Sequence, residues 1–173
     1  MLKPIQLIRQ ILIEELTIPD DRVIVYNQKW TIPPTDDLFV VVEFKHAKPF
    51  SSRNFMDASN REIQELNMQE FYTIGIFSRS TEALFRKHEV LMALGSIFSQ
   101  QLQETNSFKI SKINPIVDLS PLESTALIYR FDIDIVLFSW YEKTKVADYY
   151  NEFFGKVYTE TLSVPFTQVV PTP

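Results

Sequence analysis

Two aspartates, Asp132 and Asp134, come nearest to residues whose type and spacing could do chemistry. They lie two apart in an alternating stretch, so both carboxylates project from one face of a strand, about 6.6 Å apart. Such a pair can supply oxygen ligands to a divalent cation. Arg130 shares that face, as do Glu43 and Lys45 if the strands pair, and these charges alternate in sign. The alternation favours a cross-strand charge ladder or a polar wall over a metal site.

The two histidines, His46 and His88, lack the neighbours that metal binding or catalysis needs. His46 has no glutamate three or four residues on, and His88 is expected on the core side of a helix. The chain shows no motif for an activated nucleophile and no glycine-rich phosphate loop, and its lack of cysteine excludes a thiol nucleophile. We therefore predict a protein that is not an enzyme, with no catalytic residue, metal or cofactor. A metal-dependent enzyme that uses Asp132 and Asp134 is a distant alternative.

Composition bounds the remaining classes. The 173 residues suit one domain with an appended arm, and 14 phenylalanines against three glycines give much aromatic surface to bury or to offer to a partner. A formal charge of −5 argues against a sequence-independent DNA clamp, which needs a basic face. Residues 5–13 are too polar and too short for a signal peptide or a membrane span, so we expect a soluble intracellular product with no membrane partner.

The stretch from Arg61 to Glu104 organises the rest of the chain. Its first part alternates, with a largely apolar face that includes Tyr72, Ile74 and Ile76, and so predicts a strand. The hydroxyls of residues 78–81 can accept from the free N–H groups of a helix start. The helix that follows is predicted as one long element. The residues of its expected buried face are Leu84, Phe85, His88, Leu91, Leu94, Phe98 and Leu102.

The other elements follow from the same patterns. The sequence predicts helices over 4–16 and 146–154, the second capped by Gly155, and strands over 22–28, 38–46, 108–113, 125–141 and 156–163. We expect the α+β class, with a mainly antiparallel twisted sheet flanked by two helices and an extended C-terminal arm. Residues 1–142 would form the domain and 143–173 the arm. Residues 47–60 break every period and are predicted to be a long hairpin loop.

Two aromatic segments are candidates for contacts with other subunits. Apolar side chains in the predicted loop are unlike a solvated tip, and the arm carries six aromatic residues without a core of its own, which favours exchange between chains. The predicted interface residues are Phe50, Phe55, Met56, Tyr149, Tyr150, Phe153, Phe154, Tyr158 and Phe166.

The segment Glu70–Ile110 resembles the corresponding segment of phage neck or tail terminator-like proteins, the tail terminator or tail-completion family of long-tailed bacteriophages. In that family a strand that ends in an "IFSR"-type turn leads into a helix of "KHEVLMAL" and "SQQLQE" character. Here those motifs are Ile76–Arg79, Lys87–Leu94 and Ser99–Glu104. The similarity extends more weakly over residues 1–141.

The resemblance implies a structural virion protein, a subunit of a homohexameric ring at the head-proximal end of the tail. Such a ring caps the tail tube and joins it to the head connector or adaptor, and DNA passes transiently through its lumen. The tail tube protein and the connector are then the expected partners, with the sheath as a further candidate. The expected location is the neck or tail of the virion, and the host cytoplasm during assembly.

Under this resemblance Glu43, Arg130, Asp132 and Asp134 are candidates for a lumen wall whose acidity would limit sticking of DNA. Another head–tail connector, an adaptor or a tail-tube-related subunit is the alternative function, because such subunits share related folds.

Overall fold

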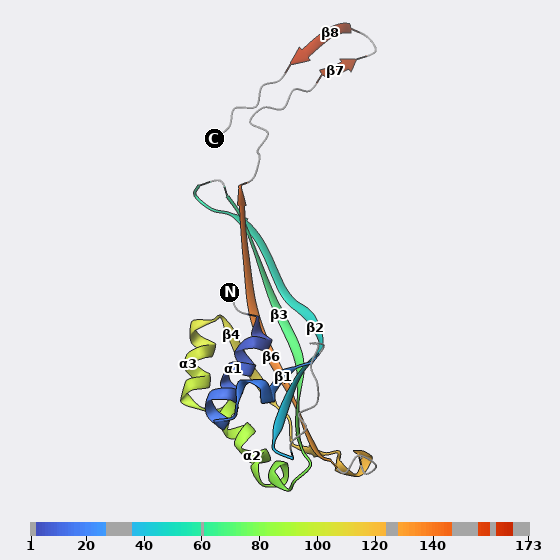
Figure 1. The fold of residues 1–173 in the computed structure, drawn as a ribbon. Helices are drawn as coiled ribbons and strands as arrows, with labels where there is room; N and C mark the ends of the chain where they lie inside the picture. The colour runs from blue at the N-terminus through green and yellow to red at the C-terminus, as the bar shows by residue number, and fades with distance from the viewer. Residues whose placement is uncertain are drawn as a thin grey trace. The chain divides into compact units, whose positions relative to one another are not determined.

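The computed structural model describes residues 3–26, 36–59, 61–123, 128–146, 156–159 and 162–167. The chain forms two compact units, Met1–Arg53 with Gln64–Lys143, and Asn54–Ile63 with Thr144–Pro173. The first unit holds three helices and most of a six-stranded sheet, and the second holds the ends of three long strands and a separate two-stranded sheet (Figure 1). The α+β class predicted from the sequence is confirmed, with three helices described instead of two.

The first helix, α1 (Pro4–Leu16), confirms the prediction for residues 4–16. Pro4 stands at its first position, where the missing N–H is not needed. Leu7, Ile8, Ile11 and Leu12 are completely or almost completely buried, as the three- and four-residue spacing predicts. A short 3₁₀ turn, η1 (Asp20–Arg22), then leads into strand β1 (Val23–Val25).

Three long strands form the centre of the sheet. They are β2 (Phe39–Met56), β3 (Arg61–Ser78) and β6 (Tyr129–Val146), in the order β1-β2-β3-β6-β4 with β5 also on β6. Strand β1 runs parallel to β2 over Val40–Val42. The other pairs are antiparallel: Phe39 and Arg53 of β2 meet Phe77 and Glu65 of β3, so the residue numbers rise on one strand as they fall on the other.

The remaining strands pair with one edge of β6. Strands β4 (Phe108–Ile113) and β5 (Val117–Asp118) both run antiparallel to it, the first opposite Ile135–Ser139 and the second opposite Phe131–Asp132. The turn η2 (Ser120–Glu123) follows β5. The sequence predicted β6 over 125–141. The described strand begins at Tyr129 and continues to Val146, so Val146 does not start a helix, and the rest of the helix predicted for 146–154 lies outside the described residues.

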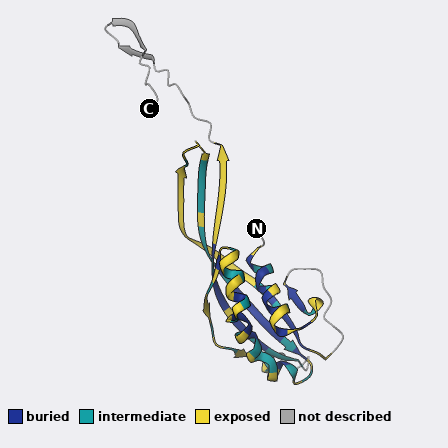
Figure 2. Ribbon diagram, turned by 90° about the vertical axis from the view of Figure 1, so that its left-hand side faces the viewer, coloured by how far each residue is buried: buried dark blue, intermediate teal, exposed yellow. Residues whose placement is uncertain are grey.

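The core lies between the helices and one face of the sheet (Figure 2). Alternate residues of each strand point toward the helices, among them Val40 and Val42 of β2, Ile74 and Ile76 of β3, and Ile133 of β6, and all five are completely buried. The opposite face, which we call the bare face, carries the residues of the other parity. Past this core the strands are less covered, and residues 44–56 of β2 are all exposed.

The prediction of a long hairpin loop over 47–60 is wrong. β2 continues to Met56, β3 begins at Arg61, and the connection is a tight turn in which the Asp57 carboxylate accepts from the N–H groups of Ser59 and Arg61 at 2.8 and 2.9 Å. Pro49 and two serines gave a turn signal. Pairing with β3 on the inner side overrides that signal, since a proline is tolerated in an edge strand.

The single long helix predicted after residue 81 is two helices, α2 (Glu82–Leu94) and α3 (Ile97–Thr105). The break lies at Gly95–Ser96, where the Ser96 hydroxyl accepts from the Ser99 N–H at 3.0 Å and caps a new helix. The prediction that a hydroxyl of residues 78–81 accepts from a free N–H group at the start of α2 is confirmed. The Ser78 hydroxyl accepts from the N–H of Ala83 at 3.0 Å.

The predicted buried face is confirmed in part: Leu94 is buried, and Leu91, Phe98 and Leu102 pack against the core. In α2, Ala83, Val90 and Ala93 are also buried, whereas His88 is exposed and Phe85 is 74% exposed. The helix has two apolar stripes. The one with the small alanines packs against α1 and the sheet, because small side chains allow close approach of two elements. The prediction that His88 is a core or core-edge residue is therefore wrong.

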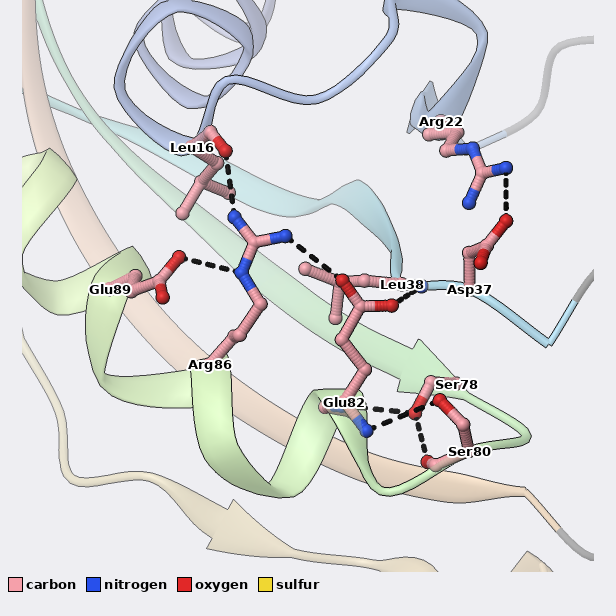
Figure 3. Close-up of polar contacts among 10 residues, drawn as sticks. Leu16, Arg22, Asp37, Leu38, Ser78, Ser80, Glu82, Arg86 and Glu89 are labelled. Carbon is pink, nitrogen blue, oxygen red and sulfur yellow. Dashed lines mark hydrogen bonds and ion pairs between the residues drawn. The ribbon is translucent and has the colours of Figure 1, made fainter.

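A polar network ties α2 to the elements around it (Figure 3). The Arg86 guanidinium donates to the Glu82 carboxylate at 3.0 Å and to the carbonyl of Leu16, the last residue of α1, at 2.7 Å. The other carboxylate oxygen of Glu82 accepts from the N–H of Leu38 at 2.7 Å. One carboxylate and one guanidinium thus join α1, α2 and the start of β2.

The C-terminal sheet belongs to the second unit. Strands β7 (Lys156–Thr159) and β8 (Leu162–Thr167) run antiparallel, with Lys156 opposite Thr167 and Thr159 opposite Leu162. The strand predicted over 156–163 is thus two strands of a hairpin, separated between Thr159 and Leu162. None of the helices in the described ranges has the length and apolar character needed to cross a bilayer.

Candidate functional site

The residues predicted as a polar wall lie together on the bare face of the sheet. Glu43 comes from β2, and Arg130, Asp132 and Asp134 come from β6, all with the parity opposite to that of the buried residues. Strand β3 lies between β2 and β6 and presents Thr73 to the same face. The alternation that buries the apolar residues of the strands is therefore what gathers these charges.

Each acidic residue of this wall has a partner. Arg130 donates two hydrogen bonds to Asp132, from Nε to Oδ1 at 3.1 Å and from a terminal nitrogen to Oδ2 at 3.0 Å. Asp134 accepts from the Thr73 hydroxyl. On β2, Lys45 Nζ pairs with Glu43 Oε2 at 2.6 Å. The wall is thus a set of local pairs of charged and polar groups.

The cross-strand ladder expected from the sequence is corrected in one respect. β2 and β6 do not pair, because β3 separates them, so Glu43–Lys45 and Arg130–Asp132 are two same-strand pairs. For the metal alternative the geometry is unfavourable, since Asp132 is engaged by a guanidinium and Asp134 by a hydroxyl. No group of three or more potential ligand residues gathers within the described ranges.

A shallow pocket of about 250 Å³ lies within this wall. Its floor is aromatic: the rings of Phe39 and Phe77 stack with centroids 5.1 Å apart, and the Arg130 guanidinium lies 5.2 Å from the centroid of Phe77. Gly75 leaves the space open, since a Cβ there would come within 2.6 Å of the Phe77 ring and 3.4 Å of Asp132. The residues around the pocket are Tyr26, Phe39, Val41, Glu43, Thr73, Gly75, Phe77, Ile128, Arg130 and Asp132.

Aromatic contacts also continue along the strands beyond the pocket. His46 stacks on Phe71 with ring centroids 4.2 Å apart, and Lys48 Nζ lies 5.7 Å from the Phe71 centroid. Phe50 packs edge-on against Phe138 at 5.0 Å. His46 and Phe50 are exposed, so these contacts are accessible at the surface.

The predicted interface residues divide into two groups. Phe50 is 51% exposed, and Phe55 and Met56 are each 36% exposed, so all three are accessible to a partner. Tyr149, Tyr150, Phe153 and Phe154 lie outside the described residues, and Tyr158 and Phe166 belong to β7 and β8. The assignment of all nine to an interface remains a prediction.

Sequence reasoning missed an exposed apolar stripe on the helices. Phe85 and Met92 of α2 are 74% and 73% exposed, and Ile97 at the start of α3 is 74% exposed. The seven-residue interval between Phe85 and Met92 places both on one side of the helix. The signal was present as a second apolar stripe on α2, but spacing alone does not say which stripe faces the core.

Sequence reasoning also missed a buried carboxylate, Glu70 of β3. It is only 5% exposed and accepts hydrogen bonds from two hydroxyls, that of Tyr72 and, at 2.6 Å, that of Tyr141 on β6. Burial, and then the hydrogen bond to the Glu70 carboxylate, raise the pKa of Tyr141 to about 12 and raise the pKa of Tyr72 further. Glu70 stands in an otherwise apolar set of even positions, which is the signal that could have identified it.

Comparison with known proteins finds similarity among solved structures. No protein-family model matches the sequence, and no curated protein matches it. Among solved structures the fold is similar to the sheath/tube terminator of PVC, an extracellular contractile injection system, in its extended state, with a TM-score of 0.47 and 14% identity. The match covers 95% of this chain and 66% of that chain, so the chain spans just under two thirds of its length.

Proposed function

We propose that the protein is a structural subunit of a tail terminator ring, which caps a tail tube and joins it to the head connector, with DNA passing through the lumen. The proposal rests on the resemblance of Glu70–Ile110 to tail terminator-like proteins. The structure gives that segment the strand–turn–helix form that the resemblance implies. Ile76–Arg79 spans the end of β3 and the turn, and Lys87–Leu94 forms the rest of α2.

The observation that carries the proposal is how much apolar surface one subunit leaves uncovered. Phe85, Met92 and Ile97 project from the helical side, and Tyr26 and Phe50, each about half exposed, lie on strands of the sheet or beside them. Soluble monomers rarely keep several such areas in water. In a closed ring each subunit contacts two neighbours through two different surfaces, so apolar areas on both surfaces become buried.

Within this proposal the polar wall on the bare face lines the lumen. Glu43, Asp132 and Asp134 give three carboxylates against two cations, the Arg130 guanidinium and the Lys45 ammonium. Like charges disfavour contact with the phosphates of DNA, so such a wall lets DNA pass without binding it. The residues share one face of one sheet, which a lumen wall requires.

The proposed partners follow from position in the tail. The ring, proposed as a homohexamer, contacts the tail tube protein on one face and the connector or adaptor on the other, with the sheath as a further candidate. The location is then the neck or tail of the virion, and the host cytoplasm during assembly. The arm after residue 146 is proposed to cross to a neighbouring subunit, with the predicted aromatic residues at that contact.

The proposal is tested by adding the purified protein to polymerising tail tube protein from the same genome and imaging the products. Terminator activity gives tubes that stop growing, each with a density at one end only. A connector or adaptor gives particles that do not bind tube ends. A tube-related subunit instead enters the tube along its length, and either of these two results contradicts the terminator assignment.

A further inference from the structure

The outer edge of β2 is an open strand edge over most of its length. On that side β1 pairs only with Val40–Val42, and the N–H of Tyr26 adds one bond to the carbonyl of Val42. From Glu43 onward β2 has β3 on its inner side, and no strand of the described ranges on its outer side. An open edge presents N–H and C=O groups that can pair with another chain.

The exposed part of this edge has an unusual charge for an acidic protein. Residues 44–56 contain two lysines, one arginine and one histidine, and no acidic residue. Lys45 and Arg53 are already paired with Glu43 and Glu65 at 2.6 and 3.1 Å. Lys48 lies over the ring of Phe71, and no carboxylate of the described residues pairs with it.

The chain also contains a separate two-stranded sheet. β7 and β8 pair only with each other in the described part of the chain. An isolated two-stranded sheet is marginally stable in water and gains from joining a third strand. Pro165 in β8 removes one backbone donor, so β7, which has no proline, is the better strand to add to an edge.

The C-terminal segment and the open edge of β2 also have opposite net charges. Residues 147–173 carry three acidic residues, Asp148, Glu152 and Glu160, which flank β7, and one lysine, Lys156, within it, whereas residues 44–56 carry three permanent positive charges. Opposite charge brings the two segments together and selects against wrong pairing. Both segments are rich in aromatic residues, which supply apolar contact once the strands are paired.

We propose that strand β7 of one copy adds to the outer edge of β2 of a second copy, beside Lys48. This inference rests on the proposed ring, because it names the surface that accepts the arm. Pro49 divides the acceptor edge, so the added strand pairs on one side of it, along residues 43–48 or along residues 50–56. The lysines and the proline keep the edge from pairing with uncharged strands of other proteins.

The absence of cysteine from the natural chain allows a direct test. Thr159→Cys places a thiol on β7 in one protein, and Ala47→Cys or Ser52→Cys places a thiol on either side of Pro49 in a second protein that carries a tag. The two proteins are mixed and mildly oxidised. A mixed disulfide between differently tagged chains can only join two copies.

The expected result is a mixed dimer for at least one of the two edge variants. Its yield should exceed that with the exposed control Gln101→Cys on α3 by about tenfold, because docked thiols have an effective concentration far above that in solution. Adding Lys48→Glu to the edge variant should lower the yield toward the control, and adding Lys109→Glu, an exposed charge reversal on β4, should not.

Three outcomes overturn the inference in different ways. If rings form but neither edge variant cross-links above the control, the ring survives and β2 is not the acceptor. If the protein is monomeric under all conditions and no mixed disulfide forms, the proposed function fails and the inference fails with it. Equal effects of Lys48→Glu and Lys109→Glu also contradict it, because the charge of the edge then plays no part.

Discussion

Arg86 shows how one side chain can hold several elements in place. Its guanidinium donates to Glu82, Glu89 and the carbonyl of Leu16, at 3.0, 2.8 and 2.7 Å. The planar group with several donors suits three acceptors at once, which an ammonium group cannot match. Removing it leaves a helix-terminal carbonyl and a partly buried carboxylate without their partner.

We expect Arg86→Ala to lower the free energy of unfolding by about 2 kcal/mol, since hydrogen bonds to charged groups are lost and their partners stay partly buried. Arg86→Lys should restore less than half of this loss. Urea denaturation of the three proteins measures the effect, with the exposed Lys109→Ala as a control that changes stability by less than about 0.5 kcal/mol. Equal stability of Arg86→Ala and the control would show that the network contributes nothing.

Glu70 and its two tyrosines predict a loss of stability at alkaline pH. The pKa of Tyr141 is raised to about 12, above the value of about 10 in an unfolded chain. A raised pKa means that the neutral hydroxyl is favoured in the folded state. Its contribution to stability is therefore complete below pH 10 and is lost as the pH rises from about 10 to about 12.

The test compares the natural protein with Tyr141→Phe. At neutral pH the variant should be less stable by about 1 kcal/mol, because one hydrogen bond to a carboxylate is lost at a partly exposed site. This difference should shrink between about pH 10 and about pH 12. A difference that stays constant over that range would contradict the role assigned to the tyrosine hydroxyl.

At the residue scale, the alternation along a strand predicts which face a residue occupies. The spacing along a helix does not do so where two apolar stripes have the same periodicity. The parity of Asp132 and Asp134 placed them on the polar face of β6, as the structure shows. For α2 the spacing predicts one buried face that draws on both apolar stripes: Leu94 is buried, whereas Phe85 and His88 are exposed. Which stripe is buried depends on how closely α1 can approach, and that information is not in the local sequence.

At the scale of the elements, two substitutions at the break between α2 and α3 should have opposite effects on stability. Ser96 caps α3 through its hydroxyl, so Ser96→Ala should cost about 1 kcal/mol of unfolding free energy. Gly95 has a φ of −95°, and a Cβ there would meet its nearest neighbours at an ordinary 3.8 Å. Gly95→Ala should therefore leave stability unchanged or raise it slightly. Thermal denaturation compares them, and the reverse order of stabilities would contradict this account of the break.

Strand β2 shows why an element can be longer than its sequence suggests. Residues 47–56 contain Pro49 and two serines and have no regular alternation, so they favour a loop. The structure has a strand there because β3 supplies a partner along its whole inner side. Pairing between strands is a long-range property, and it overrides a local turn signal at an edge that needs no second partner.

At the scale of the whole molecule, the main hydrophobic core of the described residues lies in the first unit. All buried residues of the main cluster lie between Leu7 and Leu137. Deletion of residues 147–173 should therefore leave a folded domain with unchanged helical circular dichroism. If the arm joins neighbours, the same deletion abolishes assembly, because each large ring buried between copies contributes about 2 kcal/mol.

Two results of this deletion would contradict the account. An unfolded product would show that the arm belongs to the core of its own subunit. A product that still assembles like the full chain would show that the arm does not hold neighbours together. Light scattering and circular dichroism on the same sample distinguish the two.

The central claim is that the chain is a subunit of a closed ring, and imaging the purified full-length protein by negative stain tests it most directly. Light scattering on the same preparation gives the number of copies. The account predicts rings with a central hole and a mass of six chains. A uniform population of single chains at assembly concentrations would contradict it.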